Sequence, residues 1–152
     1  IPKNKVFAVA LSFVENKNEI IMFRNMINSH YQIISKIESY KAFKEIHEII
    51  KYSDILMLGR GDLLFNCENR SILKLQEEFV KYTKQYQISS IIATDILSSL
   101  LYKSIASRAD ILDLYMLKRL NVDYLVISSH LARHENFFRS LETINTVFRC
   151  EE

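Results

Sequence analysis

The sequence predicts an α/β fold with a parallel sheet, and two observations carry that prediction. Five short runs rich in Ile, Leu and Val recur along the 152 residues, as continuous apolar stretches typical of strands buried on both faces. Between these runs, apolar residues recur at spacings of three and four, which is the pattern of helices that bury one stripe. Strand alternating with helix in this way indicates repeated right-handed βαβ units.

Two architectures fit this alternation: an open doubly wound sheet, and part of a (β/α)8 barrel. A complete barrel usually takes about 250 residues, so eight units do not fit into this chain. No linker, charge block or low-complexity stretch divides the sequence. We therefore expect a single domain over residues 1–152, and a partial barrel would comprise about five βα units.

The expected elements follow the chain in order. The strands are expected at residues 6–13, 32–37, 55–58, 88–93 and 124–127. Helical stripes are formed by Ile20, Phe23 and Ile27; by Phe43, Ile46 and Ile50; by Ile72, Leu75, Phe79 and Tyr86; and by Ile111, Leu114 and Leu117. A last helix is expected over residues 136–148. Lys, Glu and Gln lie opposite each stripe, so these apolar residues are expected in the core.

The composition is that of a core-forming chain without a strongly charged partner surface. Hydrophobic residues make up 49% and charged residues 25%, which excludes a disordered or collagen-like protein. Twenty basic and 18 acidic residues give a net charge of +2, too small to indicate a nucleic-acid or membrane surface. Cys67 and Cys150 form no C-x-x-C pair, so we expect buried free thiols in a reducing compartment, the cytoplasm or an organelle.

The start of the chain superficially resembles a secretory signal peptide. Lys3 and Lys5 precede an apolar run over residues 6–14. Polar residues follow at once and no small-residue cleavage site ends the run, so a buried strand is expected instead. The chain begins with Ile1 rather than Met, which suggests a piece of a longer protein. No run is long enough to span a bilayer.

Polar residues end the predicted strands, and in α/β folds ligands meet the carboxyl ends of strands. Lys36 and Glu38 are two residues apart, so in an extended strand they point the same way, and Asp62 follows the next strand. Two carboxylates with open water positions suit Mg²⁺, and a lysine beside them can neutralise a phosphate or an enolate. Taken singly, each of these charged residues is more often simply solvated; together they predict a site.

The glycines point to the same place. Gly59 and Gly61 are the only glycines of the chain and flank Arg60. Glycine serves where the backbone needs a positive φ or must approach another group closely. A plain turn explains either glycine alone, but explains less well why both lie here.

A histidine pair offers a weaker alternative. Thr94 and Asp95 end the fourth strand, and Ser128, Ser129 and His130 end the fifth. His130 and His134 are four residues apart and would face one way on a helix, as some zinc ligands do. No third ligand is evident, and the first histidine falls in an expected loop.

The strand ends resemble those of the pyruvate kinase family, in the later part of its catalytic barrel. Residues 10–14, Ala-Leu-Ser-Phe-Val, resemble its A-S-F-V segment, and residues 33–38 read I-I-S-K-I-E as the family does. Residues 59–63 resemble A-R-G-D-L, residues 93–97 A-T-Q-M-L, and residues 107–110 T-R-A-E. Gln76 falls where the family has L-A-Q-K. The resemblance covers nearly the whole chain and implies about the last five βα units of a (β/α)8 barrel.

The resemblance implies a role for each matching residue. Lys36 would stabilise the enolate while a phosphoryl group moves between phosphoenolpyruvate and ADP, giving pyruvate and ATP. Glu38 and Asp62 would hold Mg²⁺ or Mn²⁺. The backbone of Gly61 and Asp62 would bind the pyruvate carboxylate, with Thr94 beside the substrate. Such a site works mostly by charge and positioning.

The sequence also departs from the family pattern. Asp95 replaces the usual Gln, Ser129 and His130 replace the glycine and acid of an S-G-E loop, and residues 104–106 lack the usual Pro. Gly59 stands where the family usually has alanine and is expected to be incidental. The arginine and K⁺ ligands of the family belong to earlier strands that this chain lacks. We therefore expect the chain alone not to complete the reaction.

Two alternatives remain open beside a piece of a divergent pyruvate kinase. The chain is a non-catalytic assembly module in one of them, and in the other it belongs to a Mg²⁺-dependent lyase of pyruvate or oxaloacetate. The retained strand-end residues favour the kinase, and the altered last loop favours the assembly module. Either way, a partial barrel leaves strand edges and an apolar interior uncovered, which predicts a homo-oligomer.

Overall fold

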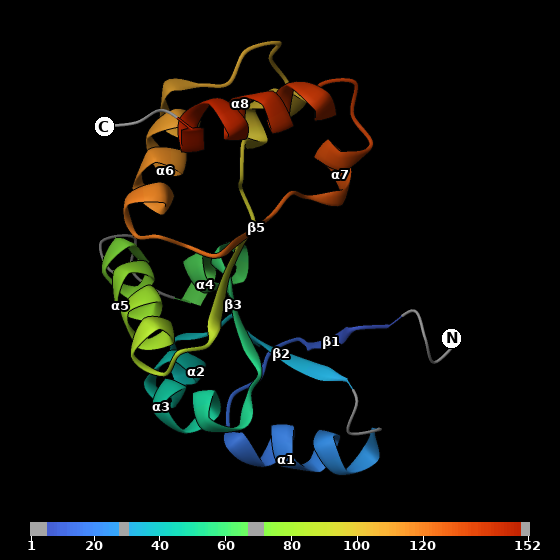
Figure 1. Ribbon diagram of the computed structural model, residues 1–152, viewed down its shortest axis with the longest axis vertical. Coiled ribbons are helices and arrows are strands. Elements are labelled where there is room, and N and C mark those ends of the chain that lie inside the picture. The colour runs from blue at the N-terminus through green and yellow to red at the C-terminus, as the bar shows by residue number, and fades with distance from the viewer. Residues whose placement is uncertain (1–5, 28–30, 67–71, 150–152) are drawn as a thin grey trace.

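The computed structural model describes residues 6–27, 31–66 and 72–149. Its centre is one five-stranded sheet in which every described neighbour pair is parallel and the strands follow one another in chain order (Figure 1). The strands are β1 (Ala8–Leu11), β2 (Gln32–Ile37), β3 (Ile55–Gly59), β4 (Ser89–Ala93) and β5 (Tyr124–Val126). A doubly wound sheet reverses its strand order at a switch point. The unbroken order therefore identifies consecutive units of a barrel and excludes the doubly wound alternative.

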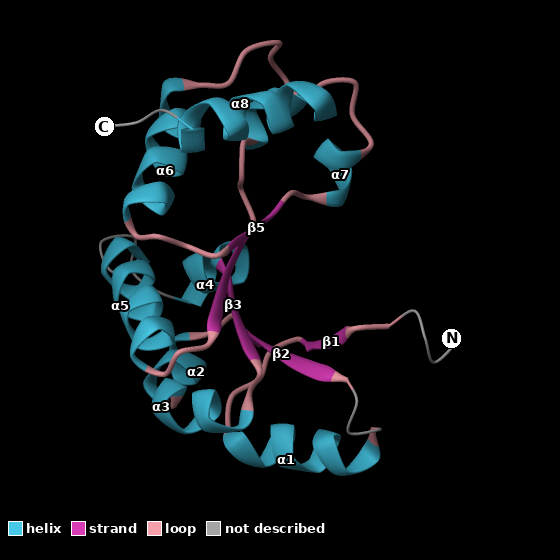
Figure 2. Cartoon of the chain, in the orientation of Figure 1, coloured by secondary structure: helices cyan, strands magenta, loops and turns pink. Residues whose placement is uncertain are grey.

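Helices follow the strands and lie along the outer side of the sheet, where they form an arc (Figure 2). The longer ones are α1 (Lys17–Met26), α5 (Ile72–Gln85), α6 (Arg108–Arg119) and α8 (Phe137–Arg149). Shorter segments are α2 (Tyr40–Lys44), α3 (Ile46–Ile49), η1 (Ile50–Tyr52), α4 (Arg60–Asn66), η2 (Ser98–Leu101) and α7 (Ser129–Ala132). The last predicted helix, at residues 136–148, is thus confirmed as α8.

Local backbone chemistry explains where the structure departs from the predicted elements. The first strand ends at Leu11 and not at residue 13, because Phe13 has a φ of 53°, which an extended strand does not accommodate. The predicted helix around Phe43 and Ile46 is divided, since Glu45 between α2 and α3 has left the helical conformation at φ −90° and ψ 5°. On α6 the buried stripe consists of Leu114 and Leu117, whereas Ile111 is partly exposed.

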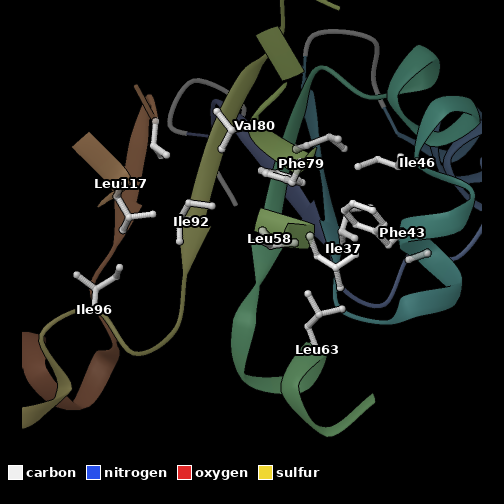
Figure 3. Packing of buried hydrophobic residues seen from close by; sticks show 14 of the residues in the cluster. Ile37, Phe43, Ile46, Leu58, Leu63, Phe79, Val80, Ile92, Ile96 and Leu117 are labelled. Carbon is white, nitrogen blue, oxygen red and sulfur yellow. The ribbon is translucent and has the colours of Figure 1, made fainter. Parts of the chain in front are cut away.

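The main core lies between the sheet and the helices. Its fully buried residues include Ile37, Leu58 and Ile92 from the strands, and Phe79 from α5 packs against them (Figure 3). The opposite face of the sheet carries a small second cluster formed by Met57, Ile91 and Ala93, against which Ile34 and Ile55 pack. Apolar residues on both faces are what makes these strands continuous hydrophobic runs.

Two aspartates fasten the amino ends of neighbouring strands in the same way. Asp54 precedes β3 and accepts a hydrogen bond from the backbone N–H of Ile33 at 2.7 Å. It also forms an ion pair with Arg24. Asp123 precedes β5 and accepts the N–H of Ser90 at 2.8 Å. In a barrel, this end of the strands serves stability and the carboxyl end serves function.

Asp123 also pairs with the ammonium of Lys84 at 2.9 Å. Burial alone raises the pKa of the Asp123 carboxyl, but the hydrogen bonds from Lys84 and Ser90 lower it by more. The net pKa lies below the usual value, so the carboxylate is ionised near neutral pH and can accept all of these hydrogen bonds.

Two sequence predictions concern cysteines and membranes. Cys67 and Cys150 lie outside the described residues, so their state as buried free thiols stays a prediction. Among the helices of the described ranges, none is long and apolar enough to cross a membrane.

Candidate active site at the strand ends

Lys36 and Glu38 form an ion pair at the carboxyl end of β2. The ammonium nitrogen of Lys36 lies 2.7 Å from Oε1 of Glu38, and their side chains are 24% and 4% exposed. This contact confirms that the two side chains share one face, as their spacing of two residues predicts. Lys36 also donates to the hydroxyl of Ser12, at 3.2 Å, from the neighbouring end of β1.

Glu38 connects the ends of three neighbouring strands. Its second oxygen, Oε2, accepts the backbone N–H of Phe13 at 2.8 Å, just beyond β1. On the other side, its side chain lies against Gly59 at the end of β3. Sequence reasoning missed that Ser12 and Phe13 hydrogen-bond to Lys36 and Glu38. Phe13 has a left-handed backbone, and the sequence carries no sign of that conformation.

Both glycines allow a close approach, and neither has a positive φ. A Cβ placed on Gly59 would lie 2.7 Å from Cγ of Glu38, and one on Gly61 would lie 2.7 Å from Cγ2 of Thr94. Such distances are shorter than real Cβ contacts. The side chains of Glu38 and Thr94 therefore leave no room for a Cβ on residues 59 and 61. The expectation that Gly59 is incidental is therefore wrong for this chain.

Asp62 and Thr94 complete the set of predicted site residues. Asp62 lies in the first turn of α4, which begins directly at the end of β3, and its side chain is exposed. Thr94 directly follows β4 and is exposed as well, with its methyl group against Gly61. The predicted residues therefore lie at the carboxyl ends of β2, β3 and β4, three consecutive strands of the sheet.

The side chains at these strand ends suit phosphoryl chemistry. They supply one ammonium, two carboxylates and the hydroxyl of an exposed threonine on the side of the sheet where barrel enzymes carry their active sites. Lys36 pairs with one oxygen of Glu38 and the N–H of Phe13 donates to the other, a carboxylate has about four lone-pair sites, and Asp62 is an exposed residue. Two hard carboxylates that leave room for water and substrate oxygens fit Mg²⁺.

A closed metal centre made entirely of side chains is a different kind of site. The described ranges contain no cluster of three or more His, Cys, Asp or Glu residues that would form one. The helical pairing considered for His130 and His134 does not form, because α7 ends at Ala132. Nδ1 of His134 instead accepts the backbone N–H of Asn136 at 3.2 Å, just ahead of α8.

The end of β5 differs in character from the other strand ends. Ser128 caps α7 by accepting the N–H of Leu131 at 3.2 Å, while Ser129 and His130 are exposed. This end therefore brings no carboxylate to the other strand ends.

Sequence reasoning also missed the surroundings of Arg60. This arginine is buried and hydrogen-bonds to the backbone of Thr94, to Gln76 and to Asp113. A pocket of about 370 Å³ beside it is lined by residues from α4, α5 and α6, and by Asp95 and Ser98. The contact between Arg60 and Asp113 spans 53 positions of sequence, so no local motif could indicate it.

Comparison with known proteins gives one consistent family. Residues 2–132 match the family described as Pyruvate kinase, barrel domain. A pyruvate kinase of Thermotoga maritima is 30% identical over 94% of this chain and 31% of its own length. One of Methanocaldococcus jannaschii is 30% identical over 95% of this chain and 33% of its own length, and the chloroplastic isozyme G of Ricinus communis is 28% identical over 95% and 35%. The chain thus spans about a third of the curated relatives it matches.

The contact between Gly59 and Glu38 yields a prediction about stability. We expect Gly59→Ala to lower the free energy of unfolding by about 1 kcal/mol, because overpacking costs about 1–3 kcal/mol while alanine recovers about 0.5–1 kcal/mol of backbone entropy. In a Glu38→Ala background Cγ is gone, so the same substitution should be neutral or stabilising. Urea unfolding of the four proteins measures both effects. Equal destabilisation in the two backgrounds would contradict the contact.

Proposed function

Because the chain belongs to the pyruvate kinase family, we propose that it carries part of a phosphoryl-transfer site acting on phosphoenolpyruvate and ADP. The single observation that supports this most strongly is the Lys36 and Glu38 ion pair beside Gly59, at a strand end adjoining Asp62 and Thr94. An ammonium and two carboxylates at adjoining strand ends match the charge that such a transfer must stabilise.

In this proposal each residue has a separate task. The bond between phosphorus and the enol oxygen of phosphoenolpyruvate breaks, and a new bond forms between phosphorus and a terminal phosphate oxygen of ADP. Lys36 stabilises the negative charge left on the enolate oxygen. The hydroxyl of Thr94, an exposed residue, would carry a proton toward the enolate carbon, which completes pyruvate.

Glu38 and Asp62 are the residues that would hold a divalent cation. Mg²⁺, when bound there, would neutralise phosphate and enolate oxygens. The backbone N–H groups at the start of α4, at Gly61 and Asp62, would meet the substrate carboxylate. The ammonium of Lys36 pairs with Glu38 and donates to the hydroxyl of Ser12, and these two contacts fix its position before substrate arrives.

The proposed site is one part of a larger one. The chain spans about a third of its relatives, and the sheet is open, with β1 paired only to β2 and β5 only to β4 among the described strands. We propose that turnover needs residues beyond the described ones, and that the 152 residues alone do not complete the reaction.

An assembly role is the second candidate, and specific observations favour it. The end of β5 brings no carboxylate, β5 is the last strand of the described sheet, and its residues Tyr124 and Val126 are 57% and 37% exposed. An exposed apolar edge strand is a template for pairing with another chain. A chain with this edge would associate whether or not the phosphoryl-transfer site is used.

Phosphoryl transfer should depend on Lys36. In the longest polypeptide that the gene encodes, Lys36→Met keeps the length of the side chain and removes its charge, so we expect transfer from phosphoenolpyruvate to ADP to fall by about a hundredfold or more. Lys51→Met, which removes a surface lysine paired with Glu48, serves as the matched control and should retain the rate. Circular dichroism checks that both variants fold. An unchanged rate in Lys36→Met would remove Lys36 from the proposed mechanism.

The open sheet predicts self-association of the 152-residue chain. Light scattering should report a dimer or a larger species, and Tyr124→Lys should reduce the mass by placing a charge on the β5 edge. Tyr102→Lys is the control, because Tyr102 is 87% exposed but caps η2 rather than lying in the sheet. A stable monomer at high concentration would contradict the proposed self-association of the chain.

A further inference from the structure

We propose that Arg60 is a positioning residue that holds Thr94 in the conformation used for the proposed phosphoryl transfer. This inference rests on the proposed function for its consequence, and on the described contacts for its geometry. Neither the family comparison nor the sequence motifs assign such a role to Arg60.

The chain takes an unusual path immediately after β4. Thr94 has a φ of 74°, Asp95 of 59° and Leu97 of 54°, so three of four consecutive residues are left-handed without being glycine. For a β-branched residue such as Thr94 this conformation is a genuine outlier. It persists only where the surrounding structure imposes it.

Arg60 supplies the contacts that impose it. Two of its nitrogens, Nε and Nη2, donate to the backbone carbonyl of Thr94 at 3.1 and 2.8 Å. Arg60 is only 8% exposed, so these hydrogen bonds compete little with water. The guanidinium thereby fixes the peptide plane that follows Thr94, which is where the chain turns into the left-handed region.

The guanidinium is itself held by two helices. Nη1 of Arg60 donates to Oδ1 of Asp113 on α6 at 2.7 Å and to Oε1 of Gln76 on α5 at 3.3 Å. Gln76 is 2% exposed, and its amide nitrogen has no hydrogen-bond partner among the described residues. The amide oxygen of Gln76 is thus directed at Arg60 from a buried position, and helps to fix the guanidinium in place.

The side chain of Thr94 is constrained from a second direction. Its methyl carbon Cγ2 is the atom closest to the missing Cβ of Gly61, with the hydroxyl oxygen farther away. With the carbonyl held by Arg60 and the methyl group packed on Gly61, the direction of the hydroxyl follows. A displacement of about 1 Å of a reacting group can lower a rate about a hundredfold, so this orientation matters.

Lysine cannot replace this arginine. A planar guanidinium directs two hydrogen bonds from adjacent nitrogens to one carbonyl oxygen and a third to a carboxylate, whereas an ammonium is a point charge on a flexible stem. Arg60→Lys therefore keeps the positive charge near Asp113 but loses the paired hydrogen bonds to the carbonyl of Thr94. We expect the backbone of residues 94–95 to relax from its left-handed conformation.

Two readouts test the proposal in the longest polypeptide that the gene encodes. Arg60→Lys should lower kcat for phosphoryl transfer about tenfold to a hundredfold, with the KM for phosphoenolpyruvate changed less than about threefold. In a Thr94→Val background, Arg60→Lys should lower kcat by a much smaller factor than in the unmodified polypeptide, because both substitutions remove the same contribution of the Thr94 hydroxyl. Multiplicative effects in the double variant would overturn the positioning role.

The second readout is the backbone ¹³C and ¹⁵N chemical shifts of Thr94 and Asp95, which report φ without any activity. Arg60→Lys should move them, while the control Arg24→Lys should not, since Arg24 donates to the carbonyl of Tyr31 and pairs with Asp54 at the opposite end of the sheet. Unchanged shifts in Arg60→Lys would overturn the proposal.

The two readouts also separate this proposal from the proposed function. An unmodified polypeptide without phosphoryl transfer, whose shifts nevertheless respond to Arg60→Lys, would refute the proposed function and support the contact with Thr94. If Arg60→Lys does not fold, Asp113→Asn loosens the same guanidinium at nearly constant size. That variant should move the same chemical shifts in the same direction by a smaller amount, and no movement would overturn the proposal.

Discussion

The in-register pairing of β2, β3 and β4 is the constraint on which the rest of the structure depends. Ile37 lies opposite Leu58, and Gly59 lies opposite Ala93, so the three strands finish at the same level. The residues that follow them are thereby brought side by side although they are far apart in sequence. The ion pair of Lys36 with Glu38, the contact of Glu38 with Gly59 and the contact of Thr94 with Gly61 all follow from this shared level.

The two ends of the sheet differ in their polar contacts: those at the amino ends join neighbouring strands, and those at the carboxyl ends form the candidate site. At the amino ends, Asp54 and Asp123 each tie one strand to its neighbour through a backbone N–H and one basic side chain. At the carboxyl ends the polar side chains are directed at one another and toward solvent, and the backbone takes left-handed conformations at Phe13 and Thr94. Left-handed residues also precede β4 and β5, at Gln87 and Asn121, so what distinguishes the carboxyl ends is the gathering of polar side chains and not the backbone alone.

Much of the fold could be predicted from the sequence because parallel strands buried on both faces leave continuous apolar runs. The site was predictable to the same depth: a spacing of two residues places Lys36 and Glu38 on one face whatever surrounds them. The end of β1 was not predictable, since the left-handed backbone of Phe13 depends on tertiary contacts. Gly59 was misjudged because its importance comes from the position of the Glu38 side chain on the neighbouring strand. The role of Arg60 depends on Asp113, which only the packing of α6 brings near.

The central claim is that the ends of β2 and β3 form one cation site for phosphoryl transfer, and Mn²⁺ binding tests it most directly. Electron paramagnetic resonance of the longest polypeptide that the gene encodes should show bound Mn²⁺, and Glu38→Gln and Asp62→Asn should each weaken binding at least about tenfold, which is the least effect typical of losing even an outer-shell partner. Glu48→Gln, a surface carboxylate paired with Lys17 and Lys51, should leave the affinity unchanged. Equal Mn²⁺ affinity in all four proteins would contradict the claim.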